Sequence, residues 1–179
     1  MTEHSVDFAL LVLRMTAGGV FLAHGINHVF GGGKIEGTGR WFESLGMRPG
    51  WLHAWTASLT EVGSGALLVA GLLTPVAAGG VVGVMLVAWI TNHAKNGFFI
   101  FRPGEGYEYV MTLTLVGLVI AVLGPGEWSL DHATGLQSHL VGWTGLWIAL
   151  GAGGGGAVAL LAAFWRPDRT PAARPEQSG

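Results

Sequence analysis

The chain contains no cysteine among its 179 residues. This absence excludes disulfide bonds, thiolate nucleophiles, cysteine-ligated metals and iron–sulfur clusters held by the chain itself. Charged residues are also scarce, at 11% of the chain, whereas a soluble domain carries about 25%. The sequence shows no flavin or nicotinamide fingerprint and no basic cluster that would indicate a nucleic-acid partner. Thiol chemistry, nucleotide-dependent redox chemistry and nucleic-acid binding are therefore not expected of this chain alone.

Apolar and small residues are abundant instead. Half of the chain is hydrophobic, with 31 Gly and 8 Trp, and the mean hydropathy is +0.51. Small residues let membrane helices approach closely, and Trp prefers the membrane–water interface. The composition predicts an all-α fold, an integral membrane helical bundle in a lipid bilayer.

Five apolar segments approach the length of about 20 residues that crosses a bilayer core as a helix. They cover residues 7–30, 51–73, 76–94, 107–123 and 140–165. The last contains the run Gly151 to Gly156, which favours a close-packing surface in lipid. The pattern predicts one domain over residues 1–165 with five transmembrane helices, the fifth at the C-terminal end. The Pro-rich polar tail, residues 166–179, is expected to be disordered.

The loops indicate an orientation. A short amphipathic segment, Gly37 to Gly46, is expected on the membrane surface. With five spans, eight of the nine Lys and Arg residues fall in the first loop, the third loop and the tail. Because cytoplasmic loops are enriched in Lys and Arg, the charge distribution predicts the orientation of this multi-pass membrane protein. Its N-terminus would lie outside and its C-terminus in the cytoplasm.

Ionisable residues within the apolar segments are the candidate functional groups, because each costs about 2.5–3.5 kcal/mol at the centre of a span. We expect a polar set to converge in one half of the membrane, and Arg14 to pair with Glu61. The candidate catalytic carboxylates are Glu61 and Glu108, and the candidate cofactor-binding residues are Arg14, His24, His28, His93 and Asn96. No metal site is expected.

Simpler roles remain open for several of these residues. Arg14 and Glu61 would then form a purely structural ion pair. His28 would be an interfacial residue near a helix end. Glu108 would favour a helix N-terminus through the helix dipole.

The order of several short motifs resembles the DoxX family of small bacterial membrane proteins. The motifs are Leu13-Arg14, Phe21 to Gly25, Trp41 to Gly46, Glu61 to Gly63, Gly71 to Thr74, His93 to Phe99, Gly106 to Tyr109, Gly124 to Gly126 and Ser129 to Asp131. The resemblance covers about Phe8 to Asp131. It implies a four-helix membrane core and a link to quinone-dependent redox, as in thiosulfate:quinone oxidoreductase subunits, or to oxidative-stress defence. Many members carry Lys where this chain has His28, so a role that needs a permanent charge there is in doubt.

Three functions follow as alternatives. The first is a quinone-binding membrane subunit, which is at most part of an oxidoreductase. In it, His24 or His93 donates a hydrogen bond to the quinone, and Glu61 or Glu108 exchanges protons with it. A protein partner supplies the electrons. The second is a non-catalytic assembly or partner-binding protein, or a small-solute carrier. The third is haem binding by His24 and His93. A homo-oligomer is left open.

Overall fold

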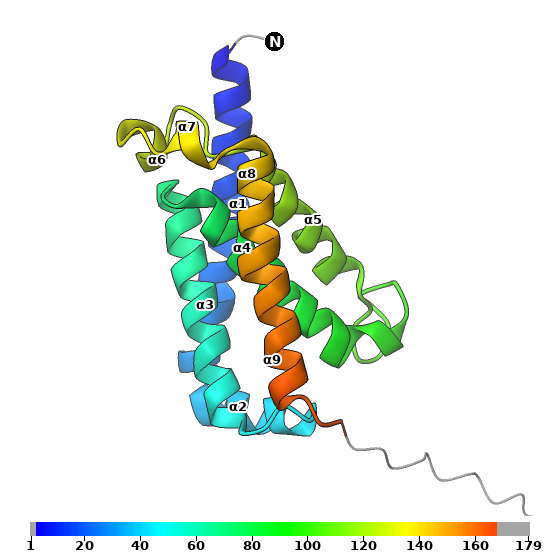
Figure 1. The fold of residues 1–179 in the computed structure, drawn as a ribbon. Helices are drawn as coiled ribbons and strands as arrows, with labels where there is room; N and C mark the ends of the chain where they lie inside the picture. The colour runs from blue at the N-terminus through cyan, green and yellow to red at the C-terminus, as the bar shows by residue number, and fades with distance from the viewer. Residues whose placement is uncertain (1–2, 168–179) are drawn as a thin grey trace, which may run out of the picture.

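The structure is a computed structural model that describes residues 3–167, and this part of the chain is helical without β-strands. The long helices are α1 (Glu3–Phe30), α2 (Lys34–Ser44), α3 (Gly50–Ala70), α4 (Thr74–Ala88), α5 (Glu108–Leu123), α8 (Gly142–Ala149) and α9 (Gly156–Phe164). Short elements are the π-helix η1 (Trp89–His93), the 3-10 helix η2 (Ala94–Asn96), α6 (Leu130–Ala133), α7 (Gln137–Leu140) and the π-helix η3 (Leu150–Gly155). The predicted all-α membrane bundle is confirmed (Figure 1). Most of the tail expected to be disordered, residues 168–179, lies outside the described residues.

Helices occupy all five apolar segments, but they differ in their ability to cross a membrane. Among the described residues, His4–Phe30, Thr74–Asn96 and Gly142–Phe164 are long and apolar enough to span, whereas Glu108–Leu123 is apolar but shorter. Helix α3 has 21 residues but is less apolar, because it carries His53 and Glu61 among several Ser and Thr residues. It also ends earlier than expected, because Gly71 adopts a left-handed conformation (φ 65°) that terminates the helix.

The helices pack as neighbours that run up and down the bundle (Figure 1). Helix α3 packs against α1 and α4, and α4 packs against α5 and the continuous α8–η3–α9 segment. Helix α2 lies across the end of the bundle where the first loop meets the end of α9. There, Trp165 Nε1 donates a hydrogen bond to the Leu45 carbonyl (3.0 Å). The first loop and the C-terminal end of α9 therefore share one end of the bundle, as a five-helix topology requires.

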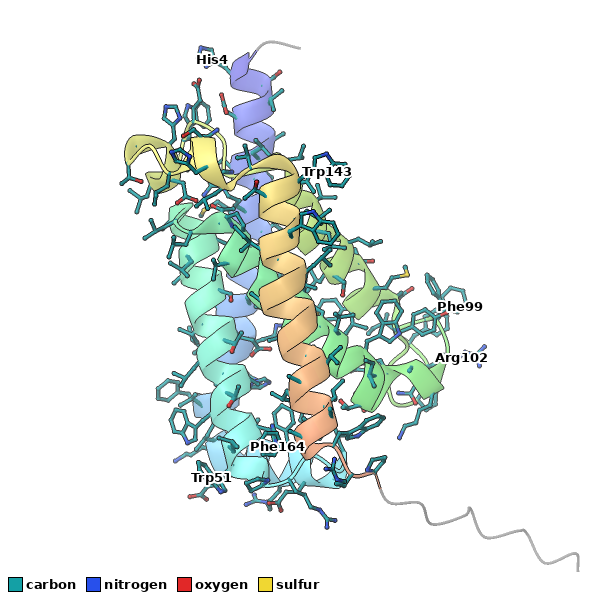
Figure 2. All side chains as sticks on the ribbon, in the orientation of Figure 1. His4, Trp51, Phe99, Arg102, Trp143 and Phe164 are labelled. Atoms are coloured by element: carbon teal, nitrogen blue, oxygen red, sulfur yellow. The ribbon has the colours of Figure 1, made fainter. Side chains whose placement is uncertain are left out.

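Exposed Trp residues mark both ends. Trp51, at the start of α3, and Trp143, at the start of α8, expose 65% and 76% of their surfaces. Figure 2 places Trp51 beside Phe164 at one end and Trp143 toward the end that carries His4. This separation suits residues that sit at the two membrane–water interfaces.

The Gly-rich run packs closely at only one of its positions. Gly153 lies against α4, where an added Cβ would collide with the carbonyl oxygen of Gly79. Conversely, a Cβ on Gly83 would lie 3.0 Å from the Gly153 carbonyl oxygen. Added Cβ atoms on Gly151 and Gly154 would meet nothing within 4 Å. The expected close-packing surface is thus confirmed at Gly153, within a segment that is a π-helix rather than a regular α-helix.

Replacing Gly153 by valine should therefore separate α9 from α4. We expect the free energy of unfolding to fall by about 1–3 kcal/mol, the usual cost of overpacking. Thermal unfolding in detergent measures the loss. Gly151→Val is the matched control, because it makes the same change in the same helix where there is space; equal losses in both variants would refute the packing account.

Candidate functional site

A cavity of about 560 Å³ lies between α1, α2, α3, α4 and the α8–α9 segment. Most of its wall is apolar or formed by glycine. Four of the predicted site residues line it: His24 and His28 from α1, Glu61 from α3 and His93 from η1. The predicted convergence of polar groups from several helices is confirmed for these four. Arg14, Asn96 and Glu108 do not line this cavity.

Glu61 is the central polar group of the cavity. Its side chain is 5% exposed, and its Oε2 lies 3.1 Å from Nδ1 of His28. Both atoms are buried, yet neither has a partner with hydrogen-bond geometry. A buried carboxylate without aligned donors is costly, so Oε2 has unused capacity to bond a ligand. The pair is close because α1 has glycine at position 25, where an added Cβ would lie 2.9 Å from the Ser58 carbonyl oxygen of α3.

His93 reaches the cavity from a π-helical turn, and π turns are frequent at functional sites. Its Nδ1 donates to the Glu105 carbonyl (2.9 Å), because a carbonyl only accepts. Its Nε2 is then left to accept from the Asn92 amide (3.3 Å). Both ring nitrogens are engaged, so the arrangement disfavours His93 as a haem ligand. Haem binding by His24 and His93 would then lack one of its two axial ligands.

His24 has one ring nitrogen engaged. Its Nδ1 donates to the Val20 carbonyl one turn earlier (2.9 Å), and its ring stacks on Tyr109 with centroids 6.0 Å apart. This tautomer leaves Nε2 as an acceptor at the cavity wall. Unlike His93, His24 is exposed.

Asn96 and Glu108 hold the loop that joins α4 to α5. The Asn96 amide donates to the carbonyls of Asn92, Gly104 and Glu105. Glu108 Oε1 accepts from the backbone N–H of Ile100 (2.9 Å). Both side chains therefore shape the loop that presents the Glu105 carbonyl to His93.

The predicted Arg14–Glu61 pair is wrong. The Arg14 guanidinium donates to the carbonyls of Leu68 (2.9 Å) and Trp128 (2.7 Å). Leu68 belongs to the last turn of α3, where the negative end of the helix dipole attracts cations, and its carbonyl also accepts from the Gly71 N–H (3.2 Å). Arg14 is fully buried and lies about 20 Å along α1 from His28, at 1.5 Å per residue. It belongs to the opposite end of the bundle from the Glu61 carboxylate.

That opposite end is a clamp built on Arg14 and Asp131. Asp131 is fully buried and accepts from the backbone N–H groups of Leu73 (2.8 Å) and Thr74 (2.9 Å) at the start of α4. Its charge also stabilises the Arg14 guanidinium. From the sequence, Asp131 was named only as part of a motif similar to the DoxX family and this role was missed, although an acidic group is favoured at a helix N-terminus.

A second carboxylate secures the same end. Asp7 Oδ1 accepts from the backbone N–H of Glu127 (2.9 Å). Together with His4, these residues bring three potential metal-ligand atoms within 4.8 Å of one another, where the sequence interpretation expected no metal. The hydrogen bond from Glu127 already gives Asp7 a structural role.

His53 was also missed by the sequence interpretation. It is 3% exposed, lines the cavity and has a buried Nε2 without a hydrogen bond. Its ring packs edge-on against Phe164 with centroids 5.2 Å apart. A signal was present, because His53, Ala57 and Glu61 are spaced four apart and share one helix face.

The comparison with known protein families gives a match over the N-terminal part of the chain. Residues 9–94 match the family model described as DoxX. They form a DoxX domain. No curated protein and no solved structure matches the chain. The DoxX domain runs from α1 through η1 and holds His24, His28, Glu61 and His93, so the resemblance is confirmed for the part of the chain that carries these four residues. The motifs from Gly106 to Asp131 lie beyond the matched residues.

Proposed function

We propose that the DoxX domain binds a quinone in this cavity and that the chain is the membrane component of a quinone-linked redox system. The observation that carries the proposal is the buried Oε2 of Glu61, which lacks an aligned hydrogen bond within a largely apolar cavity. A quinone combines an apolar ring with two carbonyl oxygens. It therefore needs an apolar slot and a few hydrogen-bonding groups, which is the composition of this wall.

A bound quinone would accept two electrons and two protons to become a quinol. Glu61 would hold one of these protons at Oε2 and donate it as a hydrogen bond to a ring carbonyl. His28 would connect Glu61 with the surface, because its side chain is 21% exposed while Glu61 is 5% exposed. His24 would accept at Nε2 from a hydroxyl of the reduced ring.

The electrons would come from a protein partner. The sequence has no cysteine for an iron–sulfur cluster and no nucleotide fingerprint. This chain would then be one subunit of an oxidoreductase rather than a complete enzyme. We place it in the bacterial plasma membrane with the first loop in the cytoplasm, because that loop carries Lys34, Arg40 and Arg48.

A binding titration tests the proposal. Purified protein in nanodiscs would be titrated with a quinone that lacks a long tail. Glu61→Leu keeps the volume but removes the hydrogen bond, so we expect a loss of affinity of about tenfold or more. Glu61→Gln keeps a donor and should retain most of the affinity.

Glu36→Leu is the matched control. It removes a carboxylate that is exposed on α2 and does not line the cavity. Its affinity for the quinone should equal that of the unchanged protein. Equal affinities for the Glu61→Leu and unchanged proteins would remove Glu61 from the site and overturn the proposal.

A further inference from the structure

We infer that the cavity takes a lipid-like quinone with a long hydrocarbon tail, and that the tail leaves the protein sideways between α3 and α9. This inference rests on the proposed quinone function and adds the substrate class and its route. It is drawn from the shape of the cavity and from the distribution of polar and apolar groups along it.

The cavity is long and chemically divided. Its lining follows α4 and η1 from Val76 to His93, a distance of about 25 Å at 1.5 Å per residue. The ionisable groups of the site, including Glu61 and His93, come from α1, α3 and η1. Helix α9 contributes only Gly156, Ala157 and Leu160 to the lining. A polar set joined to an apolar wall suits a molecule with a polar ring and a hydrocarbon tail.

The open space of the cavity lies beside Gly156. An added Cβ on Gly156 would meet nothing within 4 Å, whereas an added Cβ on Gly80 would strike Ser64 and one on Gly153 would strike the Gly79 carbonyl. The cavity is therefore closed where α4 meets Ser64 and Gly153, and its open passage is the space next to Gly156. The buried Oε2 of Glu61 lies 3.1 Å from His28 Nδ1 without hydrogen-bond geometry, which is a separate sign of a ligand at the polar groups.

The passage lies beside the lipid-facing surface. Helices α3 and α9 both pack on α4 but hardly on one another (Figure 1). Leu59 of α3 and Val158 of α9 are 65% and 68% exposed, and each adjoins a residue that lines the cavity, Thr60 or Ala157. A tail that passes Gly156 between these helices reaches hydrocarbon without crossing a polar layer.

The test compares two quinones with the same ring, one without a tail and one with several isoprene units, on protein in nanodiscs. Gly156→Leu would place a side chain in the passage without striking the backbone. We expect it to weaken binding of the long-tailed quinone by about tenfold and to leave the tailless quinone unaffected. Gly154→Leu is the matched control two residues away, with equal space around its Cβ but no place in the cavity lining; it should bind both quinones normally.

The outcomes separate the two proposals. If the tailless quinone binds only when Glu61 is present and Gly156→Leu weakens the long-tailed quinone alone, both proposals stand. If the tailless quinone binds but Gly156→Leu leaves the long-tailed quinone unchanged, the passage is not its route and this inference fails while the proposed function survives. If neither quinone binds, and the extracted protein instead carries a fatty acid or phospholipid in the passage, both proposals fail.

Discussion

Replacing Arg14 by methionine is expected to lower the free energy of unfolding by about 3 kcal/mol or more, because hydrogen bonds from a charged donor contribute about 1.5–3 kcal/mol each. Methionine cannot donate to the Leu68 carbonyl or to the Trp128 carbonyl, which Arg14 bonds at 2.9 Å and 2.7 Å. Asp131 also loses a nearby positive charge. The loop before α6 would then lose its link to α1. Thermal unfolding in detergent should show a decrease of the midpoint on the order of 10 °C.

A double variant distinguishes this account from the pairing predicted by the sequence. If Arg14 and Glu61 were partners, adding Glu61→Gln to Arg14→Met would restore stability, because no unpaired charge would remain. The structure places Arg14 against Leu68 and Trp128 instead. We therefore expect no recovery, and a recovered midpoint would show that the two side chains meet.

Replacing Asp131 by alanine should produce a loss of similar size. The two backbone N–H groups that it bonds, those of Leu73 and Thr74, begin α4 and have no helical acceptors. Each buried donor left without a partner costs about 1–3 kcal/mol, and the Arg14 guanidinium also loses a neighbouring negative charge. We expect a loss of about 3 kcal/mol or more, measured by the same unfolding transition.

Two controls accompany this variant. His132→Ala changes the neighbouring, exposed residue and should leave the midpoint nearly unchanged. Arg14→Met combined with Asp131→Ala should cost less than the sum of the single losses, because the two charges interact. Additive losses would show that Arg14 and Asp131 act independently and that the clamp is not one unit.

The positions of the helices and the polar residues of the cavity could be predicted from the sequence. Apolar runs of span length are readable because a bilayer has a fixed thickness, and polar residues within them are few. His24 and His28 are one turn apart, so a shared face was predictable. Depth along antiparallel helices then predicted that His93 lies in the polar half of the bundle and that Glu61 lies beneath it, near the midplane. Both residues line the cavity.

The partner of Arg14 could not be read in the same way. Its acceptors are backbone carbonyls at Leu68 and Trp128, and side-chain patterns contain no signal for a carbonyl acceptor. Glu108 presents a similar case, because it bonds the amide of Ile100 within an irregular loop. In both cases the partner is a backbone group. Pairing side chains by charge or chemistry therefore does not predict the contact.

The Gly-rich run was partly predictable. Its composition predicts close packing, but only the rotation of the segment decides which glycine meets α4. The π turn at η3 sets that rotation, and it directs Gly153 toward Gly79. The same turn leaves Gly156 beside the cavity, where its small size serves the proposed ligand rather than helix contact.

The most direct test of the central claim is organic extraction of the detergent-purified protein, followed by mass spectrometry for quinones against a membrane-protein control. We expect a near-stoichiometric quinone in the unchanged protein and in Glu36→Leu, and its loss in Glu61→Leu. A background level of quinone from well-folded unchanged protein would contradict the account. It would then favour an assembly or partner-binding role, in which Glu61 and His28 only stabilise the contact between α1 and α3.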